Sequence, residues 1–145
     1  AYDLYPDLEK AKSLGVTMAS MDELLATSDI VSMHLPSTAA TYHIMNDGTF
    51  EKMKEGAYFV NTARGALVDE NALFRALKYK LCAAASDVFE QEPVNVENPL
   101  FSLPNFFATP HTASETYATY KNIGLETAQA VLEVFSGRKP RNCLV

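Results

Sequence analysis

Short apolar runs alternate along the chain with longer segments in which apolar residues recur at helical spacing. The runs predict strands buried in a sheet and occupy residues 29–35, 57–60, 81–87 and 106–109. The periodic segments predict helices near residues 6–14, 20–25, 48–53, 69–79 and 114–135. A further short strand is expected at residues 16–18. Strands that alternate with helices in this way indicate an α/β fold with a mostly parallel sheet.

The segment Phe59–Glu70 combines a strand end, a turn and a helix start. Small residues follow the apolar run, and Gly65 permits a tight turn. Asp69 stands where a helix N-cap belongs. Arg64 is therefore expected at the carboxyl end of a strand, which is where open α/β sheets bind ligands. The alternative is a surface arginine near a helix start.

Two more charged residues follow the ends of predicted strands. Glu92 lies in the loop after the strand at 81–87, and His111 follows the strand at 106–109. A histidine beside a carboxylate keeps its proton more readily, which suits a general acid that protonates a carbonyl oxygen. Arginine binds a substrate carboxylate through two parallel hydrogen bonds. The alternatives are a solvated loop acid for Glu92 and a helix-capping or core histidine for His111.

The composition is that of an ordinary globular domain, because 48% of the 145 residues are hydrophobic and 21% are charged. The net charge of −6 argues against a general nucleic-acid or anionic-membrane surface. Cys82 and Cys143 lack the spacing of a metal site, so reduced thiols in a cytoplasmic protein are expected. The sequence thus predicts no nucleic acid, no membrane and no metal as a partner.

Four segments, VNTARGALVDENAL, SDVFEQEP, PLFSLPN and TPHTAS, resemble the D-isomer-specific 2-hydroxyacid dehydrogenases. The resemblance implies that Arg64 binds the substrate carboxylate and helps polarise the carbonyl. It also implies that Glu92 pairs with His111, and that His111 gives and takes the proton. The implied reaction is hydride transfer between NAD and a small 2-keto or 2-hydroxy acid, in a homodimer.

The same resemblance implies a set of cofactor-binding residues. Asp3 would hydrogen-bond the adenosine ribose and favour NAD over NADP, although an aspartate in a turn is the alternative. Asp87 would hold the nicotinamide carboxamide, with a helix cap or a loop acid as the alternative. The remaining cofactor-binding candidates are His34, Leu35, Pro36, Thr62, Ala63, Arg64, His111 and Ser114.

The chain departs from the family pattern in two respects. Tyr79, Ala83 and Ser86 stand where the family has two glycines and a leucine. No G-x-G-x-x-G is present, and the family's phosphate-binding loop is expected before Ala1. The expected architecture is a partial Rossmann-type doubly wound parallel sheet that lacks its first strand and its glycine-rich loop.

These departures bear on the domain organisation. Residues 1–145 are interpreted as an incomplete NAD-binding domain, with a tail from about residue 136 that leads toward a missing substrate domain. The raw sheet edges are expected to be covered by another copy or by further chain, since unpaired backbone is costly to bury. Taken alone, the fragment is expected neither to bind NADH tightly nor to reduce keto acids.

Several readings of the function remain open at this point. The segment NTARGALVDE resembles most the corresponding segment of glyoxylate and hydroxypyruvate reductases, then that of 3-phosphoglycerate dehydrogenase, then that of D-lactate dehydrogenase. A dinucleotide-sensing co-repressor of the same superfamily is an alternative, as is an inert structural remnant. A formate dehydrogenase-like enzyme is a further alternative, but it would partner its histidine with glutamine rather than with Glu92.

Overall fold

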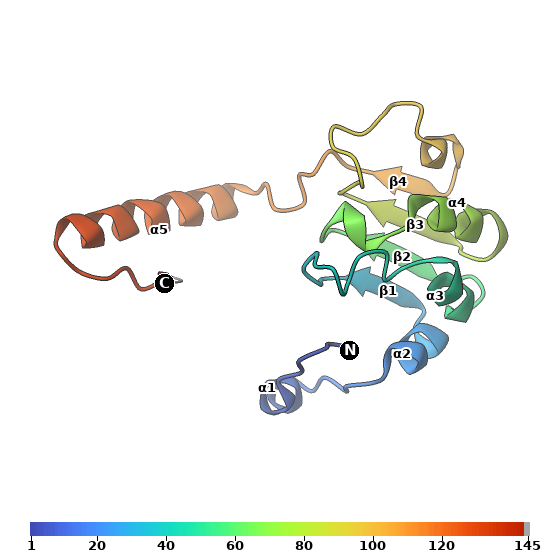
Figure 1. Ribbon diagram of the computed structural model, residues 1–145, viewed down its shortest axis with the longest axis horizontal. Coiled ribbons are helices and arrows are strands. Elements are labelled where there is room, and N and C mark those ends of the chain that lie inside the picture. Colours follow the sequence, from blue (N-terminus) through green and yellow to red (C-terminus); the bar gives the residue numbers. More distant parts are fainter. Residues whose placement is uncertain (144–145) are drawn as a thin grey trace. The chain divides into compact units, whose positions relative to one another are not determined.

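Four short parallel strands form a sheet in the computed structural model, which describes residues 1–143 (Figure 1). The strands lie side by side in chain order and are β1 (Ile30–Met33), β2 (Tyr58–Asn61), β3 (Ala83–Ser86) and β4 (Phe106–Ala108). Each neighbouring pair is parallel. The strands follow one another in one direction across the sheet, as in one half of a doubly wound domain. The predicted α/β class with a parallel sheet is confirmed.

Short helices and turns connect these strands. The helices are α1 (Leu8–Ser13), α2 (Met21–Thr27), α3 (Asp47–Lys52) and α4 (Glu70–Tyr79), and the 3₁₀ turns are η1 (Gly65–Leu67) and η2 (Pro99–Ser102). Ser20 caps α2 by accepting a hydrogen bond from the Glu23 N–H at 3.2 Å. Asp69 caps α4 by accepting from two backbone N–H groups at 2.9 and 3.1 Å. The predicted N-cap at Asp69 is confirmed, and Ser20 caps α2 in the same way.

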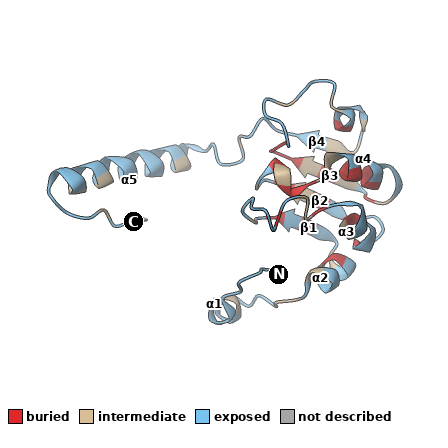
Figure 2. Cartoon of the chain, in the orientation of Figure 1, coloured by how far each residue is buried: buried red, intermediate tan, exposed pale blue. Residues whose placement is uncertain are grey.

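The core lies between the sheet and the three helices α2, α3 and α4. Phe59 in the middle of β2 is fully buried, and its ring meets that of Phe50 edge to face, with 5.2 Å between the ring centroids. Leu25 and Leu73 extend the same cluster from α2 and α4. Figure 2 shows buried positions on these elements. The core thus fixes the strands whose ends carry the candidate site.

Side chains on the second face of the sheet are exposed. Ile30, Tyr58 and Phe107 are 64%, 47% and 62% exposed, while the residues that alternate with them on β1 and β2 are buried. The expectation that residues 29–35 form a buried strand is therefore wrong for one face of β1. Parallel sheets normally carry helices on both faces, and in unit 1 (Ala1–His111) the core helices cover only one.

The predicted strand at residues 16–18 is also absent. This segment has no regular secondary structure, although it is hydrogen-bonded to the first residue. The Ala1 amino group donates to the Thr17 carbonyl oxygen at 2.5 Å, and the Ala19 N–H donates to the Ala1 carbonyl oxygen at 2.8 Å. A strand requires a partner that pairs with it over several residues, and among the described residues only Ala1 pairs with residues 17–19.

The second compact unit begins at Thr112 and is dominated by one long helix, α5 (Tyr117–Phe135). The Thr116 hydroxyl oxygen accepts from the Thr119 N–H at 3.1 Å and caps it. Gly137 follows the helix with φ of +71°, a left-handed conformation that is common for glycine just past a helix end. No residue of α5 is buried within the described chain, and across residues 1–143 no helix has the length and apolarity to cross a membrane. Residues 144 and 145 of the predicted tail lie outside the described residues.

Two residues shape the turn that follows β2. The Asn61 side chain is buried; its Nδ2 donates to the Arg64 carbonyl oxygen at 3.0 Å, and its Oδ1 accepts from the Ala63 N–H at 3.0 Å. Gly65 lies against the backbone of the next loop, so a Cβ there would be 1.9 Å from the carbonyl carbon of Phe89. The turn and this loop are thus in direct backbone contact.

Replacing Gly65 with alanine should therefore destabilise the protein. The new methyl group would meet backbone atoms that cannot rotate away, and such overpacking costs about 1–3 kcal/mol or more. Gly124→Ala in α5 is the matched control, because nothing lies within 4 Å of that position and helix propensity favours alanine by roughly 1 kcal/mol. Urea denaturation measures both changes in the free energy of unfolding. Equal effects of the two variants would contradict the close contact.

Candidate active site

The carboxyl ends of all four strands lie along one edge of the sheet (Figure 1). His34 follows β1, Thr62 follows β2, Asp87 follows β3 and Thr109 follows β4. In a parallel sheet this edge is where loops gather and where ligands bind. The candidate residues from four distant parts of the sequence are therefore brought to one rim.

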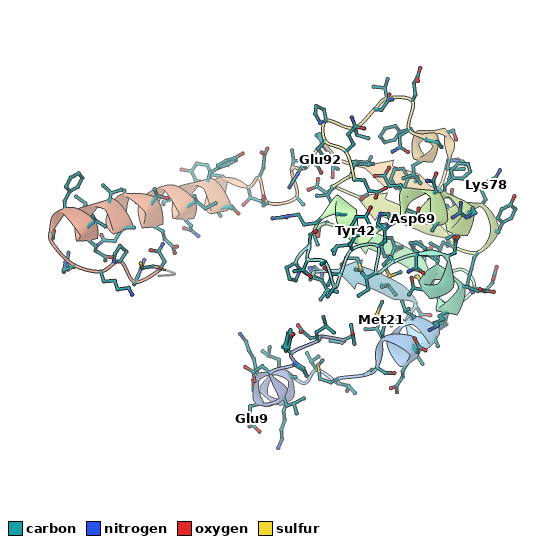
Figure 3. All side chains as sticks on the ribbon, viewed as in Figure 1. Glu9, Met21, Tyr42, Asp69, Lys78 and Glu92 are labelled. Carbon is teal, nitrogen blue, oxygen red and sulfur yellow. The ribbon has the colours of Figure 1, made fainter. Side chains whose placement is uncertain are left out.

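Glu92 and His111 form a hydrogen-bonded pair at this rim. His111 Nδ1 lies 2.7 Å from Glu92 Oε2, and Glu92 Oε1 accepts from the Phe89 N–H at 2.9 Å. The two side chains are 50% and 38% exposed, so the pair faces solvent. The hydrogen bond from His111, followed by that from Phe89, lowers the pKa of Glu92. Figure 3 labels Glu92 on the side toward which the strands point.

The structure has cavities of about 220 and 250 Å³, each of which would suit part of a ligand. The larger of the two adjoins the pair of Glu92 and His111. Its walls include Asp87, Phe89 and Val94 together with Glu92 and His111 themselves. A few polar groups in a mostly apolar wall are a typical arrangement for a small-molecule site. The His111 ring therefore borders a mostly apolar cavity.

Arg64 lies on the turn beside this cavity rather than in its wall. Its side chain is exposed, and its Nη1 donates to the Ala63 carbonyl oxygen at 2.6 Å. A guanidinium has further N–H groups with which to bind a carboxylate. The contact between Gly65 and the loop at Phe89 joins this turn to the loop that leads to Glu92. The structure thus brings Glu92 and His111 together and places Arg64 on the neighbouring turn.

A second cavity, of 220 Å³, lies beside β1 and collects three of the predicted cofactor residues. Asp3, His34 and Leu35 line it together with apolar side chains from α2 and β1. The His34 ring is held by the Ser32 hydroxyl at 2.9 Å, and Asp3 Oδ1 accepts from the Tyr5 N–H at 2.8 Å. Apolar walls suit an adenine ring and a carboxylate suits ribose hydroxyls, so these residues fit the adenosine part of NAD.

The remaining cofactor candidates are distributed around the ends of β2 and β3. Thr62 and Asp87 line a small cavity of 80 Å³, and Asp87 also borders the cavity beside His111. The Asp87 carboxylate is buried and accepts a hydrogen bond from the Thr109 hydroxyl. Asp87 therefore borders both cavities.

The last three candidates have other positions. Ala63 is partly buried and packs against the core. Pro36 precedes the loop to α3, and its carbonyl oxygen accepts from the Thr41 hydroxyl at 2.7 Å. Ser114 belongs to the second unit, which begins at Thr112. Among residues 1–143, no three His, Cys, Asp or Glu side chains gather so as to hold a metal ion.

Sequence reasoning did not single out one further ion pair near the site. His43 Nε2 is bonded to Glu90 Oε1, and both side chains are about a third exposed or less. His43 lies in the loop after β1 rather than at a strand end, so no spacing pointed to it. Glu90 stands two residues before Glu92, which is the one signal that could have suggested a shared role.

The fold and the strand-end cavities define an α/β domain of the NAD-binding kind, and comparison with known proteins identifies its family. A profile of the D-isomer specific 2-hydroxyacid dehydrogenase family, NAD binding domain, matches residues 1–113. The chain therefore belongs to this family of NAD-binding oxidoreductases. The resemblance noted in its motifs is confirmed.

Individual relatives agree with this assignment. The chain is 42% identical to D-3-phosphoglycerate dehydrogenase of Archaeoglobus fulgidus over 99% of its length and 28% of that protein. It is 39% identical to glyoxylate/hydroxypyruvate reductase B of Escherichia coli over 94% of its length and 42% of that protein. It thus spans less than half of the length of these relatives.

A solved structure supports the same fold. D-lactate dehydrogenase from Aquifex aeolicus, crystallised with NAD and lactic acid, superposes with a TM-score of 0.81 at 34% identity. The superposition covers 94% of this chain and 45% of that one. The arrangement of strands and helices described above is therefore that of an NAD-binding domain in this family.

The lowered pKa of Glu92 gives a testable dependence on pH. Because the folded state depresses this pKa, the pair stabilises the protein above the usual pKa of a glutamate, and this contribution disappears as the pH falls through the depressed value. His111→Ala should raise the pKa of Glu92 toward its usual value. Carbon-13 NMR of the glutamate carboxyl groups measures it. An unchanged Glu92 titration in this variant would show that the two groups are not coupled.

Proposed function

We propose that the protein carrying this chain is an NAD-dependent oxidoreductase that interconverts 2-keto acids and D-2-hydroxy acids by hydride transfer. The observation that supports this most directly is the hydrogen bond between His111 Nδ1 and Glu92 Oε2 at the edge where strand ends gather. Family membership and the adjoining cavity support it further.

In this proposal His111 is the general acid in reduction and the general base in oxidation. Glu92 binds Nδ1, so Nε2 is the ring nitrogen that presents its proton to the carbonyl oxygen of the substrate. The Glu92 carboxylate stabilises the charged imidazolium and fixes the plane of the ring. When bound, NADH would supply the hydride to the substrate carbon.

Arg64 binds the substrate carboxylate in the same proposal. A guanidinium matches a carboxylate with two parallel hydrogen bonds and holds it in one orientation. The buried Asn61 amide fixes the turn that carries Arg64, so the clamp stands on a rigid base. Polarisation of the adjacent carbonyl by this cation would favour attack at the substrate carbon.

The substrate belongs to the small 2-keto acids. As substrates we propose glyoxylate and hydroxypyruvate first, 3-phosphoglycerate and its 2-keto acid second, and pyruvate third. This order follows the similarity of the segment NTARGALVDE to the corresponding enzymes. The two relatives described above carry the first two of these activities in their names. NAD is proposed over NADP because the Asp3 carboxylate would repel a ribose phosphate.

Turnover by the intact, full-length protein tests the proposal. NADH oxidation is followed at 340 nm with glyoxylate, hydroxypyruvate and pyruvate, and NAD reduction with D-3-phosphoglycerate. We expect saturable turnover with at least one of them, and faster turnover with NADH than with NADPH. Tight NADH binding without turnover of any of these acids would favour the co-repressor reading instead. A homodimer in the cytoplasm belongs to the same proposal, and light scattering measures its mass.

Arg64→Lys should reduce the efficiency of the intact enzyme. Lysine keeps the charge but cannot form two parallel hydrogen bonds, so kcat/KM for the keto acid should fall. The decrease should correspond to a loss of about 2–4 kcal/mol of transition-state stabilisation. Arg75→Lys is the matched control, because Arg75 makes a bidentate contact with Asp47 between α3 and α4. Steady-state kinetics measure both variants. Unaltered kcat/KM in Arg64→Lys would remove Arg64 from the carboxylate site.

A further inference from the structure

Two histidines with unusual backbone conformations bind two glutamates of one short loop. Among residues 1–143, His43 and His111 are the only non-glycine residues with positive φ, at 47° and 59°. His43 is bonded to Glu90, and His111 is bonded to Glu92. L-residues rarely adopt this region, and those that do are held there by their surroundings. The His43–Glu90 pair therefore calls for an explanation beside that of the catalytic pair.

His43 lies in a loop whose backbone is hydrogen-bonded to η1. Its N–H donates to the Ala66 carbonyl oxygen at 2.9 Å, and the Met45 N–H donates to the Leu67 carbonyl oxygen at 3.0 Å. Its ring stacks on that of Tyr42, with the centroids 3.9 Å apart and the planes at 15°. Figure 3 labels Tyr42 on the same side of the sheet as Glu92. The ring thus reaches Glu90 from a loop fixed to the turn after Arg64.

Glu90 is fixed at its backbone as well as at its side chain. Its N–H donates to Glu70 Oε1 at 2.8 Å, while Glu70 Oε2 accepts from Asn98 Nδ2 at 2.6 Å. Gly65 lies close to the same peptide, since a Cβ there would be 2.5 Å from the Glu90 nitrogen. The preceding residue, Phe89, gives its N–H to the Glu92 carboxylate. Whatever holds Glu90 therefore also sets the position from which Glu92 is bound.

We propose that His43 and Glu90 are positioning residues, which fix the segment 89–92 so that the Glu92 carboxylate meets the His111 ring. The expected effect on turnover rests on the proposed function, whereas the expected effect on the position of Glu92 does not. Glu92 is partly exposed, and an exposed ion pair alone holds its partners weakly. A second contact on the same short segment restricts its motion, and catalysis gains from such preorganisation.

His43→Ala tests the proposal in the intact protein. Turnover of the best keto acid should fall about tenfold in kcat, because a small displacement of catalytic groups is costly, while KM for NADH stays within about twofold. His43→Gln retains a side-chain N–H for Glu90 and should restore most of kcat. Arg75→Ala breaks another exposed ion pair, that of Arg75 in α4 with Asp47 in α3, and should leave kcat unchanged.

A double-variant cycle separates positioning by the pair from any effect of His43 alone. If His43 acts through Glu90, the variant His43→Ala/Glu90→Ala should lose no more kcat than either single variant. Losses that multiply would overturn the pairing. Glu90→Gln keeps the size of the side chain and is the second route if an alanine variant fails to fold.

A structural readout keeps this inference separate from the function. Carbon-13 NMR of the Glu92 carboxyl group should show its pKa moving toward the usual value in His43→Ala, since a looser segment weakens the bond to His111. Full kcat together with an unmoved Glu92 titration would overturn the inference, and so would a loss of kcat without rescue by His43→Gln. A wild-type protein without turnover would instead overturn the proposed function, and the titration would still decide the positioning role.

Discussion

The candidate site depends on the close approach of two backbones at Gly65. Because Gly65 has no Cβ, the turn that carries Arg64 can lie directly against the peptide between Phe89 and Glu90. This contact sets the spacing between the proposed carboxylate clamp and the proposed acid–base pair. Neither group is buried, so their relative position comes from the backbones rather than from side-chain packing.

The strands contribute a second kind of order. Their buried faces form one core with α2, α3 and α4, and their carboxyl ends carry the candidate residues to one rim. Core residues such as Val31 and Met33 also line the cavity beside His34, and the core fixes the directions in which the strands end. Loops then add the chemistry: the loop after β3 supplies Glu92, and the turn after β4 supplies His111. A rigid sheet with variable ends is how this class of fold holds ligands.

Much of this could be predicted from the sequence. The strands around Phe59 and Ala84 and the caps at Ser20 and Asp69 follow from local patterns, because burial and capping leave periodic signals. The contact of Glu92 with His111 was expected from the motifs. Three features had no local signal: the single short ladder between Ala1 and residues 17–19, the exposed face of β1, and the His43–Glu90 pair. Each depends on what lies next to it in space, and the sequence does not state that.

The loop from Phe89 to Glu92 has a consequence for how such a chain can vary. Glu90 and Glu92 are two positions apart and reach different histidines, and the Phe89 N–H closes back on the Glu92 carboxylate. One inserted residue would turn one carboxylate away from its ring, whereas many exchanges at Gln91 would leave both contacts in place. The length of this segment is thus more tightly constrained than its composition. Insertions or deletions here, more than substitutions, would mark relatives that have lost the proposed catalytic function.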